Sequence, residues 1–216
     1  MSRVIEGANA LDLSSMSEIC LPDKTSSLYV HGSTKYRIAL ESSKTINPAD
    51  LNDCFRLIES TSASQYTQSS LGWKPKHKAK EMVLPDMRYL LVRRAGSDLT
   101  DGFLSFMLTY EDGHEVIYCY ELHLDSSSRG CGLGTHLMGI MESVGRKVGV
   151  EKSMLTVFLE NAAAVRFYER LGYGLDEFSP QPRRVRNRVI NPDYVILSKA
   201  LRSKGSDALE PAASNG

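Results

Sequence analysis

The sequence lacks the features that mark membrane proteins, disulfide-rich secreted proteins and general polyanion binders. No apolar run approaches the ~18 residues that a membrane-spanning helix needs, and the N-terminus has no apolar signal core. The four cysteines form no CxxC pair, which favours reduced thiols. Lys plus Arg and Asp plus Glu both number 26, so the net charge is zero, whereas polyanion binders are usually basic. We therefore expect a monomer of the cytoplasm and nucleus, with no membrane partner and no sequence-specific nucleic-acid partner.

The length of 216 residues suits one α/β domain with an additional segment at each end. Residues 1–33 are rich in Ser and have little apolar periodicity, so we expect an arm that is partly ordered or docked on the domain. Residues 34–202 contain the periodic apolar segments and form the predicted domain. Residues 203–216 have the composition of a disordered tail.

The spacing of apolar residues predicts alternating helices and strands between these ends. Asn47-Pro48 is typical of a helix start, with Asn as the N-cap and Pro at the first helical position. Asp112-Gly113 is a hairpin turn signal between two apolar segments. The predicted strands are 36–40, 88–92, 102–110, 115–124, 153–158, 173–178 and 193–197, and the predicted helices are 47–66, 75–83, 132–148 and 161–171. This order predicts a mixed sheet with helices on both faces.

The segment from Arg129 to Thr135 has three glycines between a predicted strand and a predicted helix. Glycines allow tight turns and close approach of the backbone to a ligand, and the free N–H groups of a helix start attract anions. The segment therefore suits a pyrophosphate. The dinucleotide pattern GxGxxG and the Gly-Lys-Ser/Thr of a P-loop are both absent. A glycine-rich turn without a ligand remains the alternative.

Two sequence blocks in this part of the chain resemble those of the GNAT superfamily of acetyltransferases. The first is Arg129-x-x-Gly132-x-Gly134, which resembles the acetyl-CoA signature of that family. The second is Asn161 followed by Phe167-Tyr168 and the Leu-Gly-Tyr segment 171–173. The resemblance covers roughly residues 115–178. It implies a GNAT fold, with about seven mostly antiparallel strands, splayed central strands and helices on both faces.

The same resemblance implies that acetyl-CoA is the co-substrate and that no metal is needed. The backbone of the strand before the loop would pair with the pantetheine arm, the loop would hold the pyrophosphate, and Asn161 would contact the cofactor arm. The His123 side chain itself is interpreted as an ordinary strand side chain. The cofactor-binding residues implied in this way are Leu122, His123, Leu124, Arg129, Gly130, Cys131, Gly132, Leu133, Gly134, Thr135 and Asn161.

The strand that precedes the glycine loop is unusual, because it combines two tyrosines with a carboxylate. Tyr118 and Tyr120 face one side of a regular strand and Glu121 faces the other. A glutamate in mid-strand is disfavoured and is costly to bury without a partner, which favours a functional role. GNAT proteins have a β-bulge in this strand, and a bulge would turn the three side chains toward one cleft. We therefore predict a bulge near Tyr120.

Four segments narrow the resemblance to the NatD-type N-terminal acetyltransferases. They are Tyr-Cys-Tyr-Glu at 118–121, Leu-Gly-Trp-Lys at 71–74, the strand 154–158 and Asp-Tyr at 193–194, and the likeness covers about residues 49–201. Those enzymes act on the tails of histones H-4 and H-2A, which begin Ser-Gly-Arg-Gly. The resemblance implies the same substrates, which this protein could meet as nascent chains at the ribosome.

The NatD resemblance also implies roles for individual residues. Glu121 would be the general base, directly or through water, while Tyr118 and Tyr120 would orient the water and the amine. The NatD-type enzymes have an acidic residue just before the hairpin. This chain has Thr109 at the corresponding position, and Glu111 is the nearest carboxylate. The implied substrate-binding residues are Tyr66, Trp73, Thr109, Tyr110, Glu111, Tyr120, Thr156 and Tyr194.

Several alternatives remain open at this point. The acceptor could be a lysine side chain or a small-molecule amine, or the protein could bind acyl-CoA without catalysis. Tyr168 fits either a general acid for the leaving thiolate or a core aromatic residue. The basic run from Arg183 to Arg188 fits a solvated loop, or a contact with ribosomal RNA or another acidic surface.

Overall fold

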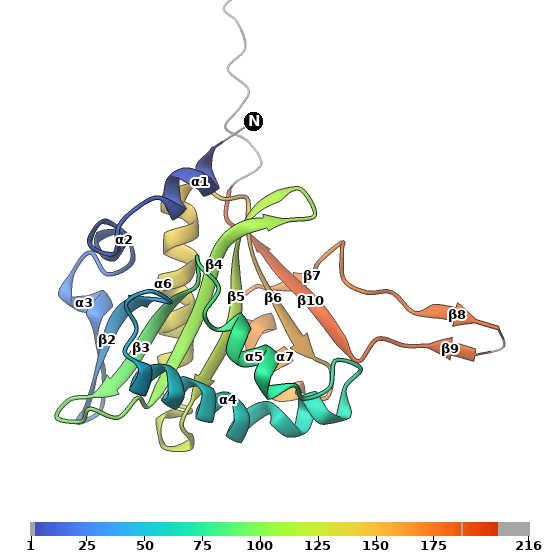
Figure 1. Ribbon diagram of the computed structural model, residues 1–216, viewed down its shortest axis with the longest axis horizontal. Helices are drawn as coiled ribbons and strands as arrows, with labels where there is room; N and C mark the ends of the chain where they lie inside the picture. The colour runs from blue at the N-terminus through green and yellow to red at the C-terminus, as the bar shows by residue number, and fades with distance from the viewer. Residues whose placement is uncertain (1–2, 187, 203–216) are drawn as a thin grey trace, which may run out of the picture.

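The computed structural model describes residues 3–186 and 188–202, and its centre is one mixed sheet (Figure 1). The sheet has eight strands in the order β1-β2-β3-β4-β5-β6-β10-β7. Every neighbouring pair is antiparallel except β5 and β6, which are parallel. The strands are β1 (Leu28–His31), β2 (Thr34–Ser42), β3 (Arg88–Arg94), β4 (Gly102–Glu111), β5 (His114–Leu124), β6 (Lys152–Phe158), β7 (Gly174–Leu175) and β10 (Tyr194–Ala200).

Helices cover both faces of this sheet and create two apolar cores. In the view of Figure 1, α4 (Pro48–Gln68) and α5 (Pro75–Glu81) lie in front of the sheet, and α6 (Leu133–Val148) lies behind it. The front core contains Ile58, Tyr89 and Phe103, which are fully buried. The core on the other face is larger and includes residues of α6 and α7 (Ala162–Arg170). The predicted mixed sheet with helices on both faces is therefore confirmed.

The segment predicted as an N-terminal arm contains three short helices, α1 (Val4–Asn9), α2 (Leu13–Cys20) and α3 (Lys24–Ser27), followed by β1. The side chains of Ile5, Met16 and Cys20 are buried in the larger core. Arg88 of β3 donates hydrogen bonds to the Ala8 carbonyl and the Asn9 side chain. The arm is thus packed against the sheet through apolar and polar contacts. The predicted tail, 203–216, lies outside the described residues.

The predicted helix cap at Asn47 and the predicted turn at Asp112-Gly113 are both present. The Asn47 side chain accepts a hydrogen bond of 2.9 Å from the Ala49 N–H, with Pro48 as the first residue of α4. Asp112 and Gly113 have φ angles of 48° and 86°, so both adopt the left-handed conformation that joins β4 to β5 in a tight hairpin. These two features fix the entry to α4 and the register of the strand pair that contains Glu121.

Three sequence-based predictions need correction. The sheet has eight strands, because Leu28–His31 pairs with β2 although its pattern is too short to stand out. The strand expected at 173–178 is limited to Gly174–Leu175. The run expected as a basic loop forms a two-stranded hairpin, β8 (Arg183–Val185) and β9 (Arg188–Ile190), that extends away from the sheet (Figure 1). Cross-strand pairing requires only a few extended residues, so such a short hairpin leaves little periodicity in a sequence. The acidic partner considered for this run stays a prediction.

Within the described residues, none of the helices combines the length and the apolar character that crossing a bilayer requires.

Candidate functional site

A cleft opens in the middle of the sheet because strands β5 and β6 part from one another. Their parallel pairing runs from Val116/Lys152 to Cys119/Leu155 and then stops, although both strands continue. Backbone groups of Tyr120–Leu124 therefore have no partner strand on this side. The splayed central strands expected from the sequence are present, and they expose unpaired backbone beside the glycine loop.

A β-bulge at Tyr120 decides which face of β5 carries the polar side chains. Ser105 pairs with Glu121, while the next residue of β4, Phe106, pairs with Cys119. Tyr120 is consequently the extra residue, and the predicted bulge is confirmed. Directly opposed residues on antiparallel strands point to the same face. Glu121 therefore shares the α4 face with Tyr118 and Tyr120, whereas a regular strand would place it on the opposite face.

A cavity of about 630 Å³ fills the space between the parted strands, the glycine loop and helices α4 and α7. Nearly all of the residues implied as cofactor-binding line it, together with Glu121, Tyr120, Tyr66 and Thr156. Cys131 does not line the cavity, since its side chain packs against the larger core. The lining residues from the implied cofactor set are Leu122, His123, Leu124, Arg129, Gly130, Gly132, Leu133, Gly134, Thr135 and Asn161.

The glycine loop has a backbone conformation that depends on glycine. Gly130 and Gly132 have φ angles of 72° and 84°, in the left-handed region that L side chains rarely adopt. A Cβ atom on Gly132 would lie 2.6 Å from the hydroxyl oxygen of Tyr29. Tyr29, from β1, donates a hydrogen bond of 2.5 Å to the Cys131 carbonyl. The N-terminal segment thus contacts the loop directly and supports its shape.

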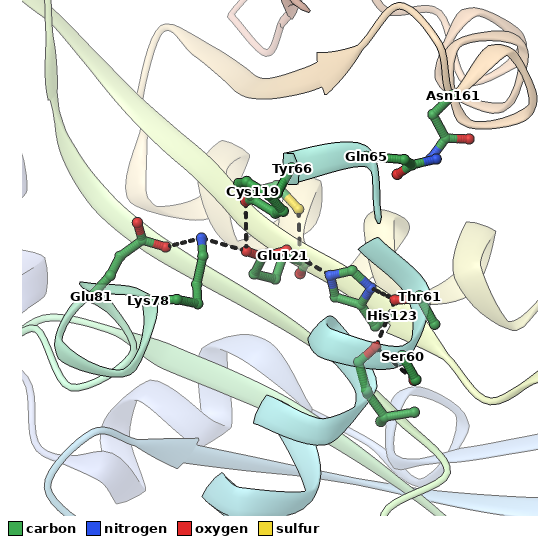
Figure 2. A network of polar contacts seen from close by, with 11 residues as sticks. Ser60, Thr61, Gln65, Tyr66, Lys78, Glu81, Cys119, Glu121, His123 and Asn161 are labelled. Atoms are coloured by element: carbon green, nitrogen blue, oxygen red, sulfur yellow. Dashed lines mark hydrogen bonds and ion pairs between the residues drawn. The ribbon is translucent and has the colours of Figure 1, made fainter. Parts of the chain in front are cut away.

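Glu121 lies at the centre of a buried polar network (Figure 2). Its side chain is 8% exposed, and Lys78 of α5 donates a hydrogen bond of 2.7 Å to its Oε1. Lys78 also bonds Glu81 Oε1 at 2.5 Å. On the other side, His123 Nε2 lies 2.6 Å from Glu121 Oε2, and His123 Nδ1 lies 2.6 Å from the Thr61 hydroxyl. The carboxylate is therefore held from both sides.

These contacts keep Glu121 ionised. Burial acts to raise its pKa, but the hydrogen bonds and charges of His123 and Lys78 outweigh burial and lower the pKa to about 2. Burial likewise acts to lower the pKa of Lys78, and the Glu121 carboxylate more than compensates, so the pKa of Lys78 is raised. The pair carries its charges throughout the physiological pH range.

Aromatic side chains form a wall near Glu121, of which Tyr66, Tyr120 and Phe158 line the cavity, whereas Trp73 and Tyr118 do not. The Tyr66 ring meets Phe158 edge-on with centroids 4.9 Å apart, and it lies 5.6 Å from the Trp73 ring. The Tyr118 and Tyr120 rings are 5.3 Å apart, and the Tyr118 hydroxyl is 2.6 Å from Thr156 Oγ1. A rigid aromatic wall of this kind can orient a small extended segment without much loss of side-chain entropy.

Not all of the residues implied as substrate-binding come together at the cavity. Tyr110 is the clear exception, because its hydroxyl donates to Glu6 of α1 on the other face of the sheet. Thr109 and Glu111 lie on the same α4 face as Tyr118, at later positions of β4, and do not line the cavity. Tyr194 is opposite Phe158 in β10 and so adjoins the aromatic wall.

The sequence interpretation missed three polar residues of the site. Lys78 contacts Glu121, 43 residues further along the chain, and Thr61 contacts His123, 62 residues further along. Gln65 accepts a hydrogen bond of 3.4 Å from the side-chain amide of Asn161, the N-cap residue of α7, and so links α4 to α7. The sequence implicates His123 through its backbone alone, yet its side chain bonds Glu121. No local motif marks these residues, since helix α4 brings Thr61 and Gln65 to the site and helix α5 brings Lys78.

The geometry fits the pantetheine and pyrophosphate of a coenzyme A thioester. The unpaired backbone of Tyr120–Leu124 can bond an amide-containing arm, and the loop before α6 presents N–H groups at a helix start. A side chain on Gly132 would contact Tyr29 of β1, so the loop can keep this conformation only with glycine at that position. Among the described residues there is no group of three or more His, Cys, Asp or Glu side chains that could hold a metal ion.

A comparison with protein families gives a match that spans this site. The model of the family described as "Acetyltransferase (GNAT) family" matches residues 54–173, which is more than half of the chain. The matched range starts in α4 and ends just after α7, so it contains the glycine loop, the parted strands and Glu121.

Individual proteins support the same assignment. N-alpha-acetyltransferase 40 of Saccharomyces cerevisiae is 33% identical over 160 residues, covering 61% of this chain and 54% of that protein. The chain thus matches about half the length of this relative. Among solved structures, the NatC complex bound to Gag peptide and CoA has a TM-score of 0.54 at 17% identity, covering 76% of this chain and 99% of that chain. Arabidopsis thaliana NAA60 with a bisubstrate analogue has a TM-score of 0.54 at 16% identity, covering 76% and 97%. At these identities the two structures support the fold alone.

Proposed function

This chain belongs to the acetyltransferase (GNAT) family, whose members use acetyl-CoA, and from this premise we propose that it acetylates the N-terminal α-amine of proteins. The single observation that supports the proposal best is the bulge that turns Glu121 to the face of Tyr118 and Tyr120, with Glu121 and Tyr120 lining the cavity. The relative named N-alpha-acetyltransferase 40 supports the same kind of acceptor. Acetylation of a lysine side chain or a small-molecule amine is the second candidate.

The residues at the cavity mouth have separate tasks in this proposal. Acetyl-CoA, when bound, supplies the activated acetyl group as a thioester. Glu121 accepts the proton that the amine loses, directly or through water, and a weak base suffices because the attacking nitrogen becomes acidic. A backbone N–H near Leu122 would stabilise the developing oxyanion. Tyr168 lines the cavity and keeps its proton, since burial raises its pKa, so it can donate to the leaving thiolate. Positioning contributes most of the rate.

The proposed acceptors are the histone tails that begin Ser-Gly-Arg-Gly. Arginine at the third position favours nearby carboxylates. Glu111 lies on the same face as Tyr118 and Tyr120 and is close enough to act on the pKa of both tyrosines. We assign the recognition of the substrate arginine to Glu111, because Thr109 occupies the position at which the resembling enzymes have an acid.

A peptide assay separates the two candidate acceptors. With acetyl-CoA and a Ser-Gly-Arg-Gly peptide that also contains lysine, we expect one acetyl group on the α-amine, located by mass spectrometry. The same peptide with a blocked N-terminus should remain unmodified, because the proposed acceptor is the α-amine. Acetylation of the blocked peptide at an undiminished rate would instead identify a lysine acetyltransferase.

The pH dependence gives an independent test. Glu121, with a pKa of about 2, remains ionised at any pH at which the enzyme is assayed. Below its pKa of about 7.7–8.0 an α-amine is protonated and cannot attack, so kcat/KM should fall about tenfold per pH unit below that value. A lysine acceptor would place the same acid limb near pH ~10.4. An acid limb near pH ~4.5 would show instead that an unperturbed carboxylate controls the rate.

A further inference from the structure

The histidine beside Glu121 uses both ring nitrogens in short hydrogen bonds. His123 Nε2 is 2.6 Å from Glu121 Oε2, and His123 Nδ1 is 2.6 Å from Thr61 Oγ1 (Figure 2). The His123 side chain is 9% exposed and packs on Phe103, with ring centroids 5.6 Å apart. The ring therefore has a fixed orientation between strand β5 and helix α4.

The positions of the protons follow from the donors and acceptors at each end. An ionised carboxylate only accepts hydrogen bonds, so His123 Nε2 must carry a proton toward Glu121. Thr61 has one hydroxyl proton, and its oxygen lies 2.6 Å from the Leu57 carbonyl, which also only accepts. When Thr61 donates to Leu57, its oxygen is free to accept, and His123 Nδ1 must carry a proton as well. With the Thr61 hydroxyl directed to the Leu57 carbonyl, the contacts of the ring are those of an imidazolium.

The charges around Glu121 agree with this assignment. Lys78 lies between Glu121 and Glu81, at 2.7 Å and 2.5 Å from their Oε1 atoms. Two carboxylates and one ammonium leave one negative charge in a buried site, and a protonated His123 brings the sum to zero. Buried charges are tolerated when they are paired and hydrogen-bonded. The nearby hydroxyl of Tyr66 and thiol of Cys119 add polar contacts without charge, at 3.4 Å from Glu121 Oε1 and 3.8 Å from the Glu121 carbonyl.

We propose that His123 and Thr61 are positioning residues of the acetyl transfer, and that Thr61 maintains His123 as the imidazolium that holds the Glu121 carboxylate toward the acceptor amine. Lys78 holds the other carboxylate oxygen. The Thr61 hydroxyl has two possible orientations. Toward the Leu57 carbonyl it stabilises the imidazolium, and toward Nδ1 it stabilises the neutral ring. The assignment of a catalytic benefit rests on the proposed function, whereas the protonation state does not.

The test replaces Thr61 with valine, which has the same shape but cannot accept from His123. We expect kcat to fall about tenfold, as for the loss of one hydrogen bond to a charged group, with little change in either KM. Thr61→Ser keeps the hydroxyl and should retain most of the activity. A Thr61→Ser variant as slow as Thr61→Val, or a Thr61→Val variant as fast as the parent protein, would overturn the positioning role.

A spectroscopic readout tests the network without turnover. In protein labelled with ¹⁵N-histidine at pH 7, the His123 ring should show two protonated nitrogens, and Thr61→Val should leave one unprotonated. The chain has five histidines, so His123→Asn identifies the resonances by their absence. A neutral ring in the parent protein would refute the imidazolium. If no peptide is acetylated while both ¹⁵N spectra agree with the expectation, the proposed acceptor is wrong and the network assignment stands.

Discussion

Replacing Glu121 with glutamine will lower kcat by about 10²–10³-fold, within the range that general acid–base catalysis contributes, while the Kd for acetyl-CoA changes by less than about threefold. Glutamine keeps the shape of the side chain but cannot accept a proton at neutral pH. Glu121 lines the cavity, whereas the groups proposed to hold the cofactor are backbone of the loop and strand. This variant should therefore lose kcat while it keeps its affinity for acetyl-CoA.

The measurements are steady-state rates with the Ser-Gly-Arg-Gly peptide and titration calorimetry with acetyl-CoA. Removing one member of a buried ion pair destabilises proteins by about 3–5 kcal/mol, so thermal unfolding must show that the variant is folded at the assay temperature. Glu115→Gln is the matched control, since Glu115 is a buried carboxylate on the same strand, paired with Arg202 and away from the cavity. It should lose stability but retain kcat. Equal losses of turnover and acetyl-CoA affinity in Glu121→Gln would make Glu121 a structural residue.

Features that depend on neighbouring residues could be predicted from the sequence, and features that depend on distant ones could not. The Asn47 cap, the Asp112-Gly113 turn and the glycine loop each depend on the conformational preferences of a few consecutive residues. The bulge at Tyr120 is predictable from the family resemblance but not from periodicity, because strand periodicity alone places Glu121 on the wrong face.

The partners of Glu121 illustrate the limit of sequence patterns. Lys78 lies on a seven-residue helix that also contains three other basic side chains, so nothing marks it as the one that turns inward. Thr61 has the helical spacing of a surface residue, and its importance arises from the position of α4 over β5. Hydrogen bonds between residues this far apart in sequence are determined by packing of the whole domain. The structure therefore identifies the groups that control the charge of Glu121, whereas the sequence identifies Glu121 alone.

Replacing Gly132 with alanine will raise the Kd for acetyl-CoA about 10²-fold, the equivalent of about 2.7 kcal/mol, while kcat at saturating acetyl-CoA changes much less. The φ angle of 84° is unfavourable for alanine by about 1–2 kcal/mol. The new Cβ atom would also lie 2.6 Å from the Tyr29 hydroxyl oxygen. Both effects move the loop away from the conformation proposed to bind the pyrophosphate, and binding must restore that conformation.

Two alanine variants separate backbone strain from the contact with Tyr29. Gly130 has a φ of 72°, but no atom lies within 4 Å of the position that a Cβ would occupy, so Gly130→Ala introduces strain alone and should weaken acetyl-CoA binding only about 10-fold. Gly139 lies in α6 with ordinary helical geometry and open space around it, so Gly139→Ala should leave the Kd unchanged and stabilise the fold by about 1 kcal/mol. If the loop holds the cofactor phosphates, the loss of acetyl-CoA affinity should be largest for Gly132→Ala, smaller for Gly130→Ala and absent for Gly139→Ala. Equal Kd values for the three variants would mean that the phosphates bind elsewhere, because only the first substitution brings a side chain against Tyr29.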